Sequence, residues 1–236
     1  GKVVALGYAH NFIEAARRAR EAILGDEFGP VQHVEASFSS DMTRFLGGQV
    51  STETPFFTRF KVTPPSENYN RPDLLGGGHG HLQLTHVAGM LFYITGLRVK
   101  TVQAQMASFG RAVDMAGAFA IEFENGAIGF LGGTGATPGF HRVALSVFCA
   151  GGMLWTDSMA GQAVIRRSDG TKEELSLQPT YPTRYNTTHN FFDTILNRQP
   201  SQASGEIGLR AVELLDAAYR SAREGGRPVS VSELYE

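Results

Sequence analysis

Cysteine is nearly absent from this chain of 236 residues, in which Cys149 is the only one. One thiol excludes a disulfide within the chain and a zinc site made of several cysteines. Proteins without disulfides are typical of the reducing cytoplasm, and we expect a cytoplasmic location.

The chain also lacks a large excess of charge, because 21 Lys and Arg side chains stand against 23 Asp and Glu side chains. This balance excludes the strongly basic surface of most nucleic-acid and anionic-membrane binders. No apolar run comes near the roughly 18 residues that a membrane helix needs. The stretch "GKVVALGYAHNF" has neither the length nor the cleavage pattern of a signal peptide. We therefore expect no nucleic-acid partner and no membrane association.

Hydrophobic residues make up 42% of the chain, which is enough for the core of an ordinary globular domain. Apolar residues at helical spacing predict a first helix over 11–26, capped by Asn11 and ended by Gly25. A strand is predicted over 31–38, followed by a long irregular stretch over 39–75. The other predicted helices are 79–95, 185–198 and 206–224, and the other predicted strands are 99–109, 116–124, 127–133, 142–150 and a hairpin within 153–177.

Asn125-Gly126 between two of these strands is a strong hairpin signal. Strands joined by hairpins, with helices grouped outside them, predict an α+β fold. We expect a large, mostly antiparallel or mixed sheet with helices packed on one face. Phe119, Ile121 and Phe123 alternate with small or polar residues and predict the packed face. The other face is expected to meet solvent or another subunit, and Trp155 is predicted to lie in the core.

The stretch "GGGHGHLQLTH", from Gly76 to His86, holds most of the candidate chemistry. It is neither a dinucleotide fingerprint nor a P-loop, because the glycine spacing, the preceding strand and a Gly-Lys-Ser/Thr end are missing. On a regular helix His79, Gln83 and His86 fall on one stripe, and nearly every other position is apolar. Polar side chains on a buried helix need partners or line a cavity. The glycines are expected to let the backbone approach a ligand closely.

This alignment leaves two interpretations open. His86 is either a core histidine with a hydrogen-bonding partner, with His79 as a cap, or both belong to a site where histidine acts as acid or base. The neighbouring glycines and Gln83 favour the site. A metal site of His79, His81 and His86 is disfavoured, because His79 and His81 diverge on a helix.

The same stretch resembles the G-G-x-x-x-D-x-x-x-H helix of the glucose–fructose oxidoreductase / inositol dehydrogenase / MocA (Gfo/Idh/MocA) family. Four other segments resemble the same template in the same order: "GYAHNFIEAARRAREAILGDEFGPVQHVEASF", "NYNRPDLLGGG", "EFENGAIGFLGGT" and "SGEIGLRAVELLDAAYRSAREGGRPVSV". The resemblance covers nearly all of residues 1–236, which we expect to form a single domain of the family's C-terminal type.

The resemblance implies an oxidoreductase that acts on a sugar, inositol or related polyol with NAD or NADP. It also implies a Rossmann domain that binds the cofactor and supplies a catalytic lysine in a Glu-Lys-Pro segment, and neither feature occurs in this sequence. We therefore expect a substrate-binding and oligomerisation domain that binds no cofactor and transfers no hydride alone. The resemblance further implies a homo-dimer or tetramer formed through the open face of the sheet.

Carried over to this sequence, the resemblance makes His86 the catalytic residue at the substrate hydroxyl, as acid/base or as an orienting donor. The family aspartate falls at Leu82, which cannot do that work. Gln83 is expected to take its place in binding, since an amide forms hydrogen bonds but takes no proton.

The remaining candidates for substrate binding are His79, Tyr8, His10, Arg71 and Tyr185. For Tyr8 and His10 the alternative is a surface loop, and for Arg71 it is a surface salt bridge. Two rival functions are a sugar-binding or sensor module without catalysis, and a histidine-metal hydrolase. We expect no bound metal.

Overall fold

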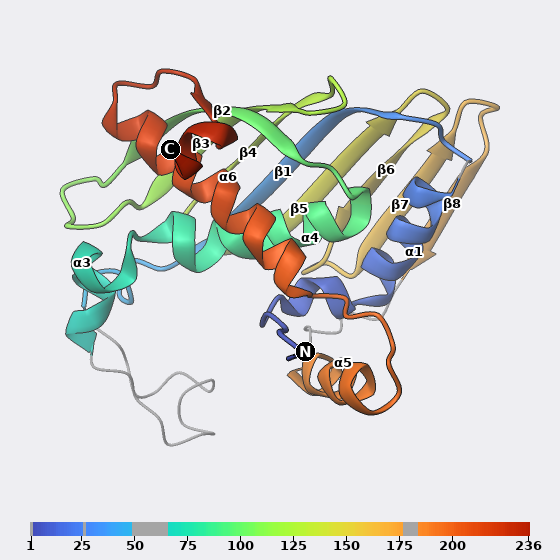
Figure 1. The fold of residues 1–236 in the computed structure, drawn as a ribbon, viewed down its shortest axis with the longest axis horizontal. Helices are drawn as coiled ribbons and strands as arrows, with labels where there is room; N and C mark the ends of the chain where they lie inside the picture. Colours follow the sequence, from blue (N-terminus) through green and yellow to red (C-terminus); the bar gives the residue numbers. More distant parts are fainter. Residues whose placement is uncertain (1, 26, 49–65, 177–183) are drawn as a thin grey trace.

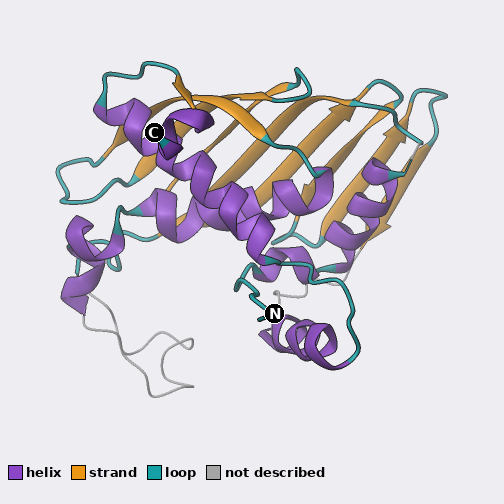
Figure 2. Ribbon diagram, in the orientation of Figure 1, coloured by secondary structure: helices purple, strands orange, loops and turns teal. Residues whose placement is uncertain are grey.

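The computed structural model describes residues 2–25, 27–48, 66–176 and 184–236, and it confirms the α+β prediction. Figures 1 and 2 show a broad twisted sheet with helices lying across one of its faces. The strands are β1 Val31–Asp41, β2 Val99–Ala107, β3 Ala116–Phe123, β4 Ile128–Thr134, β5 Ala136–Cys149, β6 Gly152–Asp157, β7 Gln162–Arg167, β8 Lys172–Ser176 and β9 Val229–Ser230.

These strands form one nine-stranded sheet in the order β8-β7-β6-β5-β1-β4-β3-β2-β9. β1 and β4 run parallel, and every other neighbouring pair is antiparallel. The sheet is therefore mixed and mostly antiparallel, as the hairpin signals predicted. Asn125 and Gly126 form the turn between β3 and β4, where Gly126 has a φ of 84° and Asn125 Nδ2 donates to the Val31 carbonyl at 3.1 Å.

The helices are α1 Glu14–Leu24, α3 Pro72–Leu75, α4 Thr85–Thr95, α5 Arg184–Leu196 and α6 Gly205–Arg223, with 3-10 helices η1 Ala9–Phe12, η2 Ser66–Asn70 and η4 Val231–Tyr235 and the π-helix η3 Gly80–Leu84. In Figure 1, α1, α4 and α6 cross one face of the sheet, and α5 lies beyond its lower edge near the N-terminus. Every residue of α4 from Val87 to Thr95 is buried, as expected of a helix that is apolar all round.

Strand alternation places the core between the sheet and these helices. Phe119, Ile121 and Phe123 are at most 4% exposed, which confirms the predicted packed face. The prediction that Trp155 lies in the core is wrong. Its neighbours Leu154 and Thr156 are fully buried, so the two-residue period of the strand turns Trp155 towards the open face, where it is partly exposed.

The predicted N-cap of the first helix is also corrected. α1 begins after Ile13, and no side chain caps it. The buried Asn11 side chain instead donates to the carbonyl of Gln202 at 2.8 Å and to that of Gly89 at 3.4 Å. Asn11 therefore ties η1 to α4 and to the segment before α6, which fixes the loop that carries Tyr8 and His10.

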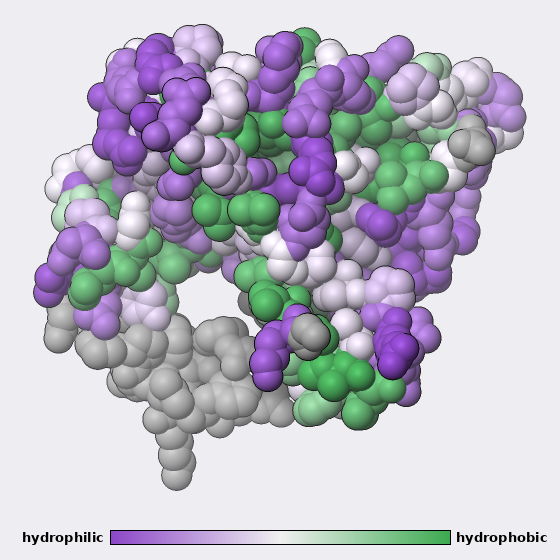
Figure 3. Space-filling view, in the orientation of Figure 1, coloured by the Kyte–Doolittle hydropathy of each residue, from purple (hydrophilic) through white to green (hydrophobic). Residues whose placement is uncertain are grey.

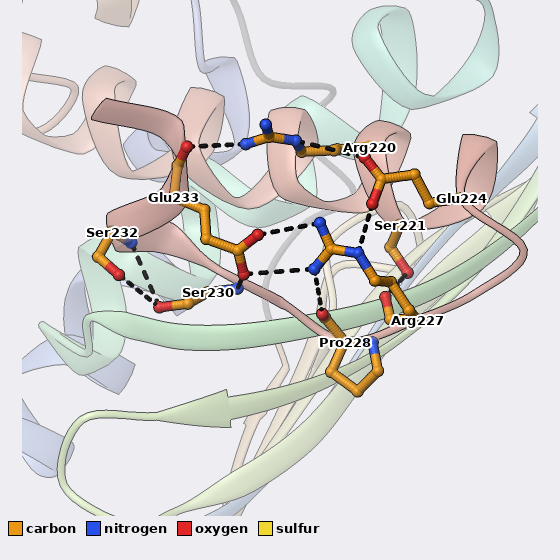
Figure 4. Close-up of polar contacts among 8 residues, drawn as sticks. All are labelled: Arg220, Ser221, Glu224, Arg227, Pro228, Ser230, Ser232 and Glu233. Carbon is orange, nitrogen blue, oxygen red and sulfur yellow. Dashed lines mark hydrogen bonds and ion pairs between the residues drawn. The ribbon is translucent and has the colours of Figure 1, made fainter. Parts of the chain in front are cut away.

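The C-terminal segment is held to α6 by a polar network (Figure 4). Arg227 Nη2 donates to Glu233 Oε2 at 2.9 Å, and Arg220 Nη1 donates to the Glu233 carbonyl at 2.7 Å. Ser221 Oγ donates to the Arg227 carbonyl at 2.6 Å and accepts from the Ala104 amide of β2 at 2.9 Å. The network joins α6, the closing turn and the edge of the sheet.

Within the described ranges, no helix has both the length and the apolar character that crossing a membrane requires.

Candidate active site

The glycine run before α4 is shaped by the protein's own side chains. A Cβ on Gly77 or Gly80 would lie 2.1 Å or 2.6 Å from the Tyr219 hydroxyl oxygen, and one on Gly78 would lie 2.2 Å from the Asp114 carbonyl oxygen. Only glycine fits where a backbone passes this close to other atoms. These contacts correct the sequence interpretation, because the glycines make room for Tyr219 and Asp114 instead of a ligand.

Asp114 and Tyr219 organise the turn that follows. The Asp114 carboxylate accepts from the Gly78 amide at 2.6 Å, the Gly80 amide at 2.8 Å and the Tyr219 hydroxyl at 2.7 Å. Burial and the Asp114 carboxylate raise the pKa of Tyr219, so its hydroxyl keeps its proton and donates. His81 stacks on the Tyr219 ring at 4.6 Å between centroids.

The chain then runs as a π-helix from Gly80 to Leu84 before the α-helical geometry of α4 begins. A π-turn carries one more residue than an α-turn, so it changes the direction in which each following side chain points. His79, Gln83 and His86 nevertheless all face the end of β1. The Phe38 carbonyl lies near His79, Ser40 Oγ donates to Gln83 Oε1 at 3.4 Å, and the Phe38 ring lies 6.3 Å from His86.

His86 lies among aromatic and hydrogen-bonding side chains of the loop before α1 and of β1. Its ring centroid lies 5.8 Å from that of Tyr8 and 6.0 Å from that of His10, both in edge-to-face arrangements. The Tyr8 hydroxyl is 2.9 Å from Thr85 Oγ1, one residue before His86. Nδ1 of His86 is buried without a hydrogen-bond partner among the described residues, so Nε2 is the nitrogen left for a ligand.

His10 and His141 complete a group that we call the histidine cluster, which consists of His10, His86 and His141 around Phe38. The Phe38 ring lies 5.8 Å from His10 and stacks on His141 at 5.5 Å. His10 is only 7% exposed, and its Nδ1 is 2.9 Å from Ser158 Oγ. Ser158 Oγ also lies 3.3 Å from the Val143 carbonyl oxygen.

The cluster is uncharged near neutral pH. Burial, followed by the neighbouring His86 and His141, lowers the pKa of His10 to about 3. Burial lowers the pKa of His86 to about 4. Burial also lowers the pKa of His141, and Asp157 partly opposes that shift. The site therefore offers neutral hydrogen-bonding groups that suit uncharged ligands.

His79 lies deeper than the sequence suggested. It is fully buried, and neither ring nitrogen has a partner in hydrogen-bond geometry. Burial lowers its pKa to about 4, and Asp114 and the Phe38 carbonyl partly oppose the shift. Gln83 is partly exposed and has weak contacts, 3.4 Å to Ser40 Oγ and 3.5 Å from its Nε2 to Met42 Sδ.

Two predicted residues are not joined to this group by any contact that the structure describes. Arg71 is exposed before α3 and forms an ion pair with Asp73, which matches the surface salt bridge that was its alternative. Tyr185 lies in the first turn of α5, and its side chain falls outside the described residues. Their roles in substrate binding stay predictions.

Sequence reasoning missed several residues of the site. Phe38 and Ser158 gave no signal, because each is an ordinary residue of a strand or turn. Tyr219 gave a faint one, as a large aromatic among alanines on the apolar side of α6. Asp114 lies between two strands, where an isolated acidic residue reads as a loop position.

Two hollows of about 580 Å³ each lie away from the histidine cluster. One is lined by α4, α5 and α6, and the other lies on the open face of the sheet over β2, β3 and β4. Across the described ranges, no group of three His, Cys, Asp or Glu side chains is arranged to hold a metal ion.

Comparison with known proteins assigns the fold. The family model described as the GFO/IDH/MocA C-terminal domain matches residues 16–155. The comparison with curated proteins gives no match.

Among solved structures, an oxidoreductase domain protein from Kribbella flavida is 19% identical, with a TM-score of 0.75 over 95% of this chain and 64% of that one. Levoglucosan dehydrogenase in complex with NADH and L-sorbose is 18% identical, with a TM-score of 0.74 over 95% of this chain and 64% of that one. Aldose–aldose oxidoreductase from Caulobacter crescentus, in complex with glycerol, is 20% identical, with a TM-score of 0.73 over 98% and 64%.

These similarities show a shared fold, and the chain spans less than two thirds of the length of these relatives. The family model covers more than half of this sequence. The chain therefore belongs to the GFO/IDH/MocA C-terminal domain family.

Proposed function

We propose that this chain is the substrate-binding and oligomerisation domain of an NAD(P)-dependent dehydrogenase that acts on a sugar, inositol or related polyol. The observation that carries the proposal is the neutral, hydrogen-bonding surface around His86 Nε2, built from Tyr8, Thr85 and His10. Such groups suit hydroxyls, which donate and accept hydrogen bonds without charge. Two structurally similar proteins are described in complex with a sugar or a polyol, L-sorbose and glycerol.

His86 is proposed to contact the oxygen that reacts. A neutral imidazole carries its proton on one nitrogen, and a buried N–H without an acceptor is costlier than a buried lone pair. Because Nδ1 of His86 is buried and unpartnered, the proton belongs on Nε2. His86 then donates from Nε2 to the substrate oxygen and orients it. Leu82 stands where the family has a carboxylate, so no acid at that position supports proton uptake by His86.

Gln83 and Tyr8 are proposed to line the rest of the substrate site. The weak contacts of Gln83 to Ser40 and Met42 are easily exchanged for hydrogen bonds to a ligand hydroxyl. Tyr8 is held by Thr85 and packs against the glycine at position 89, which places its ring beside His86. NAD or NADP is proposed to bind to a Rossmann domain that residues 1–236 do not contain, so this chain alone should bind substrate without oxidising it.

The rival is a sugar-binding module without catalysis, and Leu82 in place of an acid favours it. A panel of sugars, inositols and acyclic polyols, tested on the full-length protein with NAD and with NADP, separates the two. The dehydrogenase proposal expects reduced cofactor to form with at least one member of the panel. Binding of a polyol without any turnover would establish the rival, and an absence of both would reject both.

A further inference from the structure

We infer that His10 and His86 together bind two adjacent hydroxyl groups of a cyclic polyol, and that Ser158 holds His10 in the orientation this needs. The inference takes its substrate class from the proposed function and goes further. It makes a vicinal diol the recognised unit. It also gives a defined role to His10, which the sequence made a candidate for substrate binding, and to Ser158, which the sequence did not indicate.

Each of the two histidines has one ring nitrogen that is left for a ligand. Nδ1 of His10 bonds to Ser158 Oγ at 2.9 Å, and Nδ1 of His86 is buried. Each ring therefore has Nε2 left for a ligand. Two imidazoles with one accessible nitrogen each offer two hydrogen bonds to one molecule.

The two histidine rings lie close enough for one ligand to reach both. The centroids of His10 and His86 are 6.0 Å apart, and the ring planes meet at 80°. The Phe38 ring packs beside both, with its centroid 5.8 Å from that of His10 and 6.3 Å from that of His86, and limits how far either ring can move. Two nitrogens on crossed rings at this spacing can reach neighbouring oxygens of one ligand, whereas a single hydroxyl occupies only one of them.

Ser158 fixes the orientation of the His10 ring through its hydrogen bond to Nδ1. Its hydroxyl has one proton, which goes either to His10 Nδ1 or to the Val143 carbonyl. In the first arrangement Nε2 of His10 donates to the ligand, and in the second it accepts. A hydroxyl group matches both arrangements, while a carboxylate or phosphate matches only a donor.

Nuclear magnetic resonance of the chain with labelled histidines tests the inference directly. The imidazole nitrogen signals are followed while cis-cyclohexane-1,2-diol or cyclohexanol is added. The diol should shift the Nε2 signals of both His10 and His86 and bind about tenfold more tightly than the mono-alcohol, since it gains one neutral hydrogen bond. Equal affinity, an unshifted His10, or no binding of the diol would overturn the inference.

Variants separate recognition from folding. In His10→Ala the diol and the mono-alcohol should bind with about equal affinity, and both should still shift the Nε2 signal of His86. Ser158→Ala keeps the ring but removes its anchor, and should lower the preference roughly threefold. His33→Ala is the control, because His33 is a partly exposed histidine near Glu35, outside the cluster, and should change nothing. A preference that survives the loss of His10 contradicts the inference.

His10→Phe, which keeps a ring of similar size without nitrogens, provides the same test if the alanine variant does not fold. The outcome is independent of turnover. A protein that shows the diol preference but never reduces NAD or NADP disproves the dehydrogenase and leaves this inference standing. A protein that reduces NAD or NADP but shows no diol preference supports the dehydrogenase and disproves this inference.

Discussion

At the scale of single residues, the site is made of imidazoles that burial keeps neutral. His10, His79 and His86 each have a pKa lowered to about 3 or 4, mainly by burial. The folded chain cannot easily take up protons at these positions, while the unfolded chain can. The site therefore lowers the stability of the protein in mild acid and gains an uncharged binding surface in return.

The first prediction follows from the sign of these shifts. Between pH about 6.5 and about 4 the unfolded chain binds more protons than the folded one. The free energy of unfolding should therefore decrease as the pH is lowered through this range. The loss should be complete below the folded pKa and on the order of 3 kcal/mol for one histidine shifted this far. Urea unfolding at several pH values measures it.

His79→Phe serves as the matched variant, because phenylalanine keeps a buried ring that takes no proton. Its stability should decline less steeply over the same range. A wild-type stability that stays flat from pH 7 to pH 5 contradicts the assignment of neutral, buried histidines.

At the scale of elements, the π-turn before α4 depends on a residue from a distant helix. Tyr219 of α6 lies over the glycines and donates to Asp114, which in turn accepts from two amides of the turn. Together they satisfy amides at the start of the helix that no preceding turn can satisfy. The position of His86 thus depends on packing between α4 and α6.

Tyr219→Phe is predicted to destabilise the protein by about 1.5–3 kcal/mol, the usual cost of losing a hydrogen bond to a charged group. The ring and its stacking on His81 remain, so only the hydroxyl is tested. Thermal unfolding measures the change. Tyr235→Phe is the control, because Tyr235 also donates to a carboxylate, that of Glu213, but on the surface of the protein. Equal midpoints for both variants would disprove the role given to Tyr219.

Elements with strong local signals were predicted well. The alternation around Phe119 and the Asn125-Gly126 turn depend on neighbouring residues only, so β3, β4 and their hairpin could be read from the sequence. The π-turn could not. A period of 3.6 residues predicts a uniform helix from His79, whereas the π-helix over Gly80–Leu84 forms where the distant residues Asp114 and Tyr219 contact the backbone.

At the scale of the whole molecule, the two faces of the sheet have different surroundings. Helices cover one face, and the open face carries Phe130 and Ile128 at 47% and 58% exposure beside small residues such as Ala118 and Ala120. An apolar surface of this kind is typical of an interface. On the helical side, Figure 3 shows apolar side chains over α5, where Phe192 and Leu196 are exposed.

We predict that the open face joins two copies of this chain. Phe130→Asp introduces a charge into that surface and should shift the protein from dimer or larger assembly towards monomer. Light scattering after size-exclusion chromatography measures the mass. Phe192→Asp on α5 is the control, with similar exposure on the other side of the molecule. A wild-type chain that is monomeric at all concentrations, or a Phe130→Asp variant that still assembles, contradicts this prediction.

The candidate site was only partly predictable because its members come from distant parts of the chain. The helix pattern and the family resemblance pointed to His86, and the resemblance also made Tyr8 and His10 candidates for substrate binding. The pairing of His10 with Ser158 and the contacts of Phe38 with His10 and His86 join distant segments of the chain and appear only in three dimensions. Arg71 was chosen from a local motif, and its described partner is Asp73.

Whether His86 contacts the reacting oxygen is tested by the steady-state kcat/KM of the full-length protein and its His86→Ala variant with the preferred polyol and cofactor. If His86 contacts the reacting oxygen, kcat/KM should fall at least tenfold, or about 1.4 kcal/mol of transition-state stabilisation. Because the change also removes a ring that packs against Tyr8 and His10, the unfolding midpoint is measured as well, to show that the variant is folded at the assay temperature. An undiminished kcat/KM in a folded variant would contradict the account.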